Sequence, residues 1–349
     1  MLRELYKAIE LPVFQNKMYP DQASALAAPM GSLLLVQDSE TGLVFNSTFD
    51  QKFLSYDQDY QNEQAHSDFF QKHLSSVKSI IENFFSDKTI IEVGCGKGFF
   101  LDYLIEHGFN VKGIDPAYEG DSPNVIKACF DVSLGIKADN IVLRHVLEHI
   151  PDPFAFLKAI AKANGGKGKI YIEVPCLNWI LTHKAWFDIF YEHVNYFRLQ
   201  DFNAMFETVY ESGHIFGDQY IYVVADLASL KTPKLAESDF IKFPNDFLNV
   251  EKVMSKLNPL GKNVVWGGAS KGVIFSLNAK RFGFNIDYVV DINPSKQGKY
   301  IGGTGLLVSS PDSLIEKLTN DDNIFVMNSN YFDEIVKSSG NKFNYIKVD

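Results

Sequence analysis

The chain has 349 residues, of which 46% are hydrophobic and 22% are charged, a composition typical of a soluble globular protein with two or three domains. Its formal net charge of −10 disfavours a nucleic-acid partner, because an acidic surface repels the phosphate backbone. Three scattered cysteines and the lack of an apolar run of ~20 residues argue against disulfides, a cysteine zinc site and a membrane span, so we expect a cytoplasmic protein.

Residues 1–65 predict a small, mostly irregular domain with short strands at Ser32–Gln37 and Leu43–Asn46. Apolar residues with helical spacing follow from His66 to Phe85. Strand patterns then alternate with helices in TIIEVG, NVKGID, NIVLRHV and KIYIEVP, which is typical of a parallel sheet with helices on both faces. The patterns VYESGHIF and YIYVVADL predict an antiparallel hairpin that closes this sheet. We therefore expect an α/β domain over residues 66–230.

A linker rich in Lys, Pro and Asp extends from about Lys231 to Asn245. The alternation then restarts with the strand patterns NVVWGG, NIDYVVD, NIFVMN and FNYIKV. The helices expected between them are Lys271–Phe282, Ser313–Leu318 and Phe332–Ser338. Residues 245–349 therefore predict a second, smaller Rossmann-like α/β domain.

The strongest local motif is a glycine loop that directly follows the strand ending at Glu92 and Val93. Gly94, Gly96 and Gly98 stand at alternate positions, which allows a tight turn and the close approach of a ligand to the backbone. A dinucleotide fold has the spacing GxGxxG instead. The pattern here matches the first motif of class I methyltransferases that use S-adenosylmethionine (SAM), in which the loop faces the methionine part of the cofactor.

Three further residues are expected to hold the nucleoside part of SAM. Asp115 ends the next strand, where its carboxylate can accept hydrogen bonds from both ribose hydroxyls. Phe130 and Asp131 follow the third strand, where they would flank the adenine and hydrogen-bond it. The alternative is a generic turn with a capped acidic residue. The interval to Asp115 and the closing hairpin favour SAM over NAD.

The segment His145–His149 has the HxxEH spacing of an inverted zinc-protease motif. That motif requires both histidines on one helical face, and here the segment leaves a strand and is followed at once by Pro151 and Pro153. We therefore expect no metal, and a loop at the carboxyl end of the strand, where open α/β sheets bind ligands. His149 is then a candidate for the active site, and His145 a partly buried structural histidine.

The segment FDIFYEHVNYF, residues 187–197, places an acid–base pair among five aromatic rings, just after the strand that ends at Cys176. His193 is the candidate base, and Glu192 would orient it and raise its basicity. Phe190, Tyr191 and Tyr196 would form the substrate pocket. The alternative is that Glu192 and His193 cap structural groups. The position on the ligand side of the sheet favours an active site.

At this point the sequence resembles the three-domain SAM-dependent sugar C-methyltransferases, which act on nucleotide-linked 4-keto-6-deoxy sugars. The resemblance covers most of the chain and rests on EVGCGKG, HVLEHIPDP, YEHVNYF, GGASKG, DINPSKQGKYIGG and NSNYFDEI. It implies a Rossmann-like third domain, and a sugar nucleotide bound in the cleft by the N-terminal and central domains.

Two departures from that family matter. Its N-terminal domain binds zinc through two cysteine pairs, whereas Asp38 and Thr41 stand in place of the second pair here, and the first pair is missing. We therefore expect a degenerate, metal-free N-terminal domain. The family also has a tyrosine base three residues before the histidine, and this position is Phe190, which cannot move a proton.

Three functions stay open on the sequence alone. The first is a C-methyltransferase acting on a nucleotide-linked (keto)deoxysugar, with His193 as the base. The second is an O- or N-methyltransferase of the same fold acting on another small molecule, whose lone pair needs less help from a base. The third is a catalytically inactive SAM-binding partner protein, against which the intact glycine loop and Glu192–His193 pair argue. The acceptor and the oligomeric state cannot be predicted.

Overall fold

The computed structural model describes residues 1–53, 67–85, 89–135, 137–236 and 239–349. The domain boundary predicted at residues 65 and 66 lies outside these residues. In the described part, no helix combines the length and apolarity that crossing a membrane requires. Within these residues the chain forms sheets of four, seven and five strands and a separate two-stranded pair.

The central sheet has seven strands in the spatial order β11-β12-β9-β8-β5-β6-β7. Five are parallel: β5 (Thr89–Val93), β6 (Asn110–Ile114), β7 (Val125–Ile126), β8 (Asn140–Arg144) and β9 (Lys169–Pro175). The strands β11 (Val209–Ile215) and β12 (Tyr220–Asp226) form an antiparallel hairpin whose second strand pairs with β9. This order is that of a class I methyltransferase fold, and the hairpin is where the sequence predicts it.

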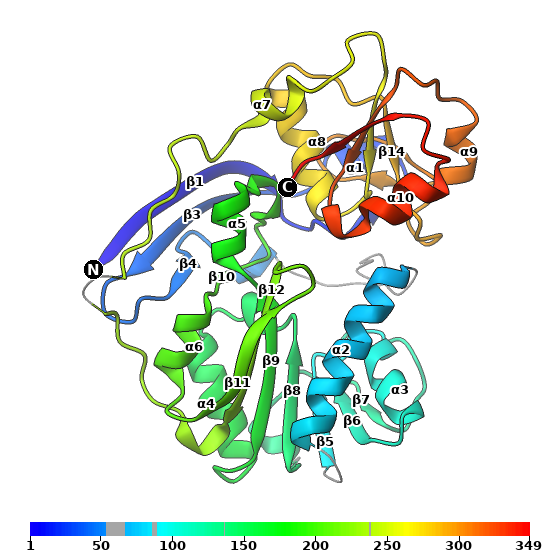
Figure 1. Cartoon of the computed structure of the whole chain (residues 1–349). Coiled ribbons are helices and arrows are strands. Elements are labelled where there is room, and N and C mark those ends of the chain that lie inside the picture. Colours follow the sequence, from blue (N-terminus) through cyan, green and yellow to red (C-terminus); the bar gives the residue numbers. More distant parts are fainter. Residues whose placement is uncertain (54–66, 86–88, 136, 237–238) are drawn as a thin grey trace.

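Helices cover both faces of the central sheet, because successive residues of its buried strands point to opposite sides. Ile90 packs in the cluster with residues of α2 (Asp68–Phe85) and α3 (Phe99–Glu106). Its neighbour Ile91 packs in the cluster with α4 (Pro153–Ala163) and α6 (Leu199–Met205) on the other side. The carboxyl ends of the parallel strands point toward the other two domains in Figure 1, so ligands can bind between them.

The N-terminal sheet takes one of its strands from the central part of the chain. Its order is β1-β3-β4-β10, with β1 (Leu2–Pro12), β3 (Met30–Asp38), β4 (Val44–Asn46) and β10 (Asn195–Tyr196). The strand β10 lies within the aromatic segment 187–197 and pairs antiparallel with β4. The pairing ties the candidate active-site segment to the N-terminal domain. The structure corrects the expectation of an irregular N-terminus, since β1 runs for 11 residues.

The C-terminal domain has a five-stranded parallel sheet in the order β16-β14-β13-β17-β18, the Rossmann-like arrangement predicted for it. Its strands are β13 (Asn263–Trp266), β14 (Tyr288–Val290), β16 (Val308–Ser309), β17 (Asn323–Val326) and β18 (Asn344–Lys347). Its helices are α8 (Lys271–Arg281), α9 (Pro311–Ile315) and α10 (Phe332–Ser338). The helix α10 has its predicted ends, and the ends of α8 and α9 lie within one and three residues of theirs.

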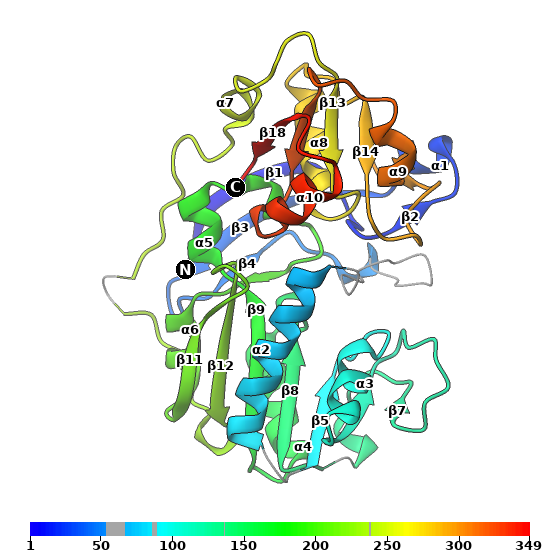
Figure 2. The same ribbon diagram turned by 45° about the vertical axis from the view of Figure 1, so that its right-hand side comes forward.

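The N-terminal segment also crosses to the C-terminal domain. The strand β2 (Met18–Tyr19) pairs with β15 (Tyr300–Ile301), and α1 (Gln22–Leu26) lies beside the C-terminal sheet in Figure 2. Two further helices, α5 (Leu177–His183) and α7 (Val250–Met254), are not predicted from the sequence. In the view of Figure 1, the helix α5 lies between the N-terminal sheet and the C-terminal domain.

Candidate active site

The glycine loop at the end of β5 has the conformation that the sequence predicts. Gly94, Gly96 and Gly98 have φ angles of 79°, 56° and 83°, in the left-handed region that favours glycine. A Cβ atom on Gly94 would approach Val146 Cγ2 to 2.3 Å, whereas one on Gly96 would meet nothing within 4 Å. Gly94 is therefore required by packing, and the backbone at Gly96 borders open space in which a ligand can lie.

Asp115 braces this loop from the end of β6. Its carboxylate accepts hydrogen bonds from Gly96 N over 2.7 Å and from Ala117 N over 2.8 Å, and burial raises its pKa. An ionised carboxylate has about four acceptor positions, so acceptor capacity remains for ribose hydroxyls. Asp115 thus fits the role predicted for it, and it holds the glycine loop in shape as well.

Glu92 is buried near the end of β5, just before the glycine loop, with 2% of its surface exposed. Its Oε2 atom has no hydrogen-bond partner in the described structure, and burial raises its pKa to about 7. A buried, unsatisfied carboxylate oxygen is costly, and a positively charged ligand group would satisfy it. The methionine part of SAM carries such a group, so the orphaned oxygen and the open backbone at Gly96 fit this cofactor.

The residues predicted around the adenine are more exposed. The Asp131 carboxylate accepts a hydrogen bond from Ser133 N over 2.7 Å, as the cap of a short 3-10 turn, Val132–Leu134. Phe130 packs edge to face against Phe156, with the ring centroids 5.8 Å apart. Asp131 therefore has a structural partner already, and its contact with adenine stays a prediction.

His193 lies in a buried box of aromatic rings, with 8% of its surface exposed. The Phe190 ring meets the imidazole edge to face at a centroid distance of 4.9 Å, and the His149 ring does so at 5.0 Å. Burial, together with the nearby His149 and His145, holds the pKa of His193 well below its usual range. The imidazole is therefore neutral near pH 7, in the form that accepts a proton.

Glu192 does not raise the basicity of His193, and this expectation from the sequence is wrong. Its buried carboxylate accepts a hydrogen bond from Gln15 N over 3.1 Å, in the N-terminal domain. The Nδ1 atom of His193 has no hydrogen-bond partner in the described structure, and the pKa of the ring is lowered, not raised. The side chain of Glu192 thus anchors the segment to the N-terminal domain, whereas the side chain of His193, the next residue, packs on Phe190 and His149.

The three predicted pocket residues separate in the same way. Only Phe190 packs directly on His193 among them; the Tyr196 ring lies 6.2 Å away, and its hydroxyl bonds Phe190 N and O. The Tyr191 hydroxyl accepts a hydrogen bond from Asp50 N over 3.0 Å, and its ring packs on Phe49. Tyr191 thus holds the N-terminal domain, and Tyr196 holds the shape of the box.

His149 joins the box from a different segment. It ends a short 3-10 turn, Leu147–His149, and its Nδ1 atom hydrogen-bonds the Glu192 carbonyl over 3.0 Å. Burial lowers the pKa of His149, so that ring is neutral near pH 7 as well. The sequence predicts both histidines for the active site, but their contact is not visible in the sequence.

His145 lies in a neighbouring network of charged side chains, in the structural role that the sequence predicts for it. Its Nε2 atom lies 3.1 Å from Glu173 Oε1, and its Nδ1 atom lies 3.3 Å from Glu148 Oε1. Burial opposes the charged form, but these two carboxylates outweigh it and raise the pKa of His145 to about 9. Glu173 also accepts hydrogen bonds from Arg144 and Tyr171. Sequence reasoning missed Glu173, which lies inside an otherwise apolar strand.

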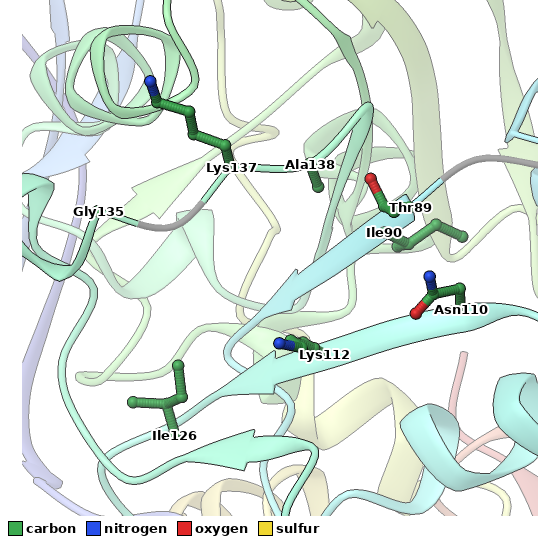
Figure 3. A pocket seen from close by; sticks show the side chains of 8 residues that line it. All are labelled: Thr89, Ile90, Asn110, Lys112, Ile126, Gly135, Lys137 and Ala138. Carbon is green, nitrogen blue, oxygen red and sulfur yellow. The ribbon is translucent and has the colours of Figure 1, made fainter.

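A cavity of about 420 Å3 lies at the opposite edge of the sheet, where β5 and β6 begin. Figure 3 shows the side chains of Thr89, Asn110 and Lys112 around it. The cavity lies at the amino ends of these strands, so it is remote from the glycine loop and from His193. Open α/β sheets bind their ligands at the opposite, carboxyl ends of the strands. We assign it no part in the chemistry.

Comparison with known proteins defines the class. Residues 61–209 match the model of a methyltransferase domain, and residues 246–344 match the model of a C-methyltransferase C-terminal domain. Together with the strand order and the glycine loop, the first match makes the central part of the chain a SAM-dependent methyltransferase domain of class I fold, with SAM as its cofactor. The second match places a C-methyltransferase type of domain behind it.

Individual relatives resemble the chain over a shorter stretch. Ubiquinone biosynthesis O-methyltransferase of Idiomarina loihiensis is 29% identical over 112 residues, which are 27% of this chain and 46% of that protein. The Coxiella burnetii protein of the same name is 30% identical over 100 residues, 25% of this chain and 43% of its own. The matched segments thus span less than half of these relatives. A solved SAM-dependent methyltransferase from Archaeoglobus fulgidus has 17% identity and a TM-score of 0.36, covering 46% of this chain and all of its own.

Proposed function

We propose that this chain is a SAM-dependent C-methyltransferase that acts on a nucleotide-linked (keto)deoxysugar, with His193 as the general base. The observation that carries the proposal is the buried His193 in a box at the carboxyl ends of the central strands, with a lowered pKa and, among the described residues, no hydrogen-bond partner for Nδ1. The C-methyltransferase type of C-terminal domain supports methylation at carbon.

Bound SAM supplies an electrophilic methyl group on a positively charged sulfur. Carbon next to a ketone becomes a nucleophile when it loses a proton, and the lone pair of His193 accepts that proton. The glycine loop, Glu92 and Asp115 would hold SAM so that its methyl group, which leaves its bonding electron pair on sulfur, is the electrophile for this carbon. The aromatic walls, with Phe190 nearest, exclude water from the reacting groups.

A variant of His193 tests the base directly. His193→Ala removes the proton acceptor and should lower turnover by ~10²–10⁴. Binding of S-adenosylhomocysteine, measured by calorimetry, should be retained, because the glycine loop and Asp115 are not changed. Turnover close to that of the wild type would overturn the assignment of the base.

A second candidate is transfer to oxygen or nitrogen of another small molecule. Two observations favour it: Phe190 stands where a second base is expected, and the relatives above are named O-methyltransferases. A lone pair on oxygen or nitrogen attacks with less proton abstraction, so positioning would do most of the work. His193→Ala would then cost much less than in the first candidate.

A further inference from the structure

A second property of the same box comes from Glu148, the residue before His149. One ligand atom each of Glu148, His149 and His193 lies within 4.8 Å of the others. Glu148 and His193 are more than nine-tenths buried, at 1% and 8% exposure. This is the group of three such side chains that the described residues bring close enough together to hold one ion.

Two side chains of this cluster, Glu148 and His193, have buried polar atoms without a hydrogen-bond partner in the described structure. Neither oxygen of Glu148 nor Nδ1 of His193 has one in the described structure, although Glu148 Oε1 lies 3.3 Å from His145 Nδ1 as an ion pair. Buried polar atoms are nearly always satisfied, so Glu148 Oε2 and His193 Nδ1, which have no partner of either kind in the described structure, indicate a missing ligand. Two imidazole nitrogens and one carboxylate oxygen form a donor set for a cation, not for an anion.

The surrounding contacts hold the cluster in place for such a ligand. His149 Nδ1 bonds the Glu192 carbonyl, which leaves its Nε2 atom with the lone pair, as in most metal-binding histidines. The Asn195 amide donates to the carbonyls of Ile150, over 2.6 Å, and Leu147, over 3.4 Å. These bonds fix the turn that carries Glu148 and His149 against the segment that carries His193.

We propose that Glu148, His149 and His193 bind one divalent transition-metal ion of the zinc or cobalt type. Imidazole ligands suit these ions, whereas Mg²⁺ and Ca²⁺ prefer oxygen alone, and three protein ligands leave coordination positions open. The proposal departs from the expectation that no metal binds. That expectation examined His145 with His149, and the structure turns His145 toward Glu173 instead.

Metal binding has a consequence that rests on the proposed function. A neutral imidazole has one lone pair, and a metal ion bound to His193 occupies it. The same lone pair is then unable to take a proton from the substrate. Zinc should therefore inhibit methyl transfer, and a chelator should restore it.

The test of the site needs neither SAM nor an acceptor. The full chain, stripped with a chelator, is titrated calorimetrically with Zn²⁺ and with Mg²⁺, and with Co²⁺ while the visible spectrum is recorded. We expect one Zn²⁺ per chain, no comparable binding of Mg²⁺, and cobalt absorption bands of a site with nitrogen ligands. No saturable binding of Zn²⁺ or Co²⁺ would overturn the proposal.

Variants locate the ion. Glu148→Gln and His149→Ala should each weaken Zn²⁺ binding by about tenfold or more. His107→Ala is the matched control, since His107 is exposed at the end of α3 and should leave Zn²⁺ binding unchanged. Binding of S-adenosylhomocysteine verifies that each variant is folded. Folded ligand variants that bind Zn²⁺ like the wild type would overturn the site, and if Glu148→Gln does not fold, His149→Ala decides.

The two proposals fail separately. Absence of metal binding leaves methyl transfer by His193 intact as a proposal, because that assay is done in the presence of chelator. Stoichiometric Zn²⁺ at these residues without inhibition supports the metal site and counts against His193 as the base.

Discussion

Gly96 offers a direct test of the cofactor loop at the scale of one residue. Its φ is positive and its Cβ direction is open, so alanine there adds some backbone strain, about 1–2 kcal/mol, and a methyl group in the space assigned to SAM. We expect Gly96→Ala to fold and to bind S-adenosylhomocysteine at least about tenfold more weakly. Calorimetric titration measures this loss.

Gly108 supplies the matched control. It also has a positive φ, 86°, and a Cβ there would meet nothing within 4 Å, but it lies just after α3, away from the loop. Gly108→Ala should therefore carry a similar strain and keep the affinity for S-adenosylhomocysteine. Equal losses of affinity in both variants would show that strain alone, and not contact with the cofactor, causes the effect.

His193 should keep the rate of methyl transfer constant to a lower pH than an ordinary histidine base would. Burial lowers the pKa of this imidazole well below its usual range, so it stays unprotonated as pH falls through about 6.5. We expect kcat to hold its plateau through this range and to decline only at lower pH. A decline centred at or above pH 6.5 would contradict the assignment of His193 as the base.

Phe190 separates the two candidate functions. Phe190→Tyr adds a hydroxyl to a buried ring that packs on His193. For transfer to carbon, the rate should rise, since a second proton acceptor returns to the box. For transfer to oxygen or nitrogen, the rate should stay level or fall through crowding, which steady-state kinetics with the accepted substrate distinguishes.

At the scale of elements, one buried network links β8, β9 and the turn Leu147–His149. His145 lies between Glu148 and Glu173, and they raise its pKa to about 9. Because the pKa of His145 is higher in the folded than in the unfolded chain, protonated His145 stabilises the fold. This stabilisation is complete below about pH 6.5, the pKa of an unperturbed histidine, and is lost as pH rises through about 9. The His145 side chain is 30% exposed, so solvent screens its charge in part. We therefore expect it to contribute on the order of 2 kcal/mol to the free energy of unfolding.

The variant His145→Gln isolates that contribution. The free energy of unfolding, measured with urea, should fall between about pH 6 and about pH 10 in the wild type. The fall should be larger in the wild type than in the variant, by on the order of 2 kcal/mol. The same pH dependence in both proteins would mean that His145 is not charged in the fold.

The elements that the sequence predicts are those with a clear periodic pattern. The central strands are continuous apolar runs, and the glycine loop and Asp115 follow them at fixed places, so the sequence predicts these elements and a candidate cofactor site beside them. The strand β1 could not be predicted, because most of its residues are exposed or half-buried and its pairing with β3 has two register shifts. The sequence of β1 therefore lacks the regular alternation of polar and apolar residues by which a strand is recognised.

The candidate site was predictable in its members but not in its contacts. His149 and His193 stand out as residues, yet they lie 44 positions apart, and the sequence does not show that Glu148 joins them. The orientations of Glu192 toward Gln15 and of Tyr191 toward Asp50 depend on the N-terminal domain packing on the segment. Such long-range contacts leave no mark in a local pattern.

At the scale of the whole molecule, the three sheets share connections and should unfold together. The strand β10 belongs to the N-terminal sheet, β2 pairs with β15, and Lys271 at the start of α8 forms an ion pair with Asp188 over 3.1 Å. We expect one calorimetric transition for the full chain, which Lys271→Gln shifts to lower temperature without splitting. Two separate transitions in the wild type would contradict this coupling.

The position of the transferred methyl group tests the account most directly. The chain is incubated with SAM carrying a ¹³C-labelled methyl group and with a panel of nucleotide-linked keto sugars, in the presence of chelator, and the product is examined by carbon NMR. The account predicts a new methyl signal with the shift and couplings of carbon attached to carbon. A methoxy or N-methyl signal, or no transfer to any keto sugar by protein that binds S-adenosylhomocysteine, would contradict it.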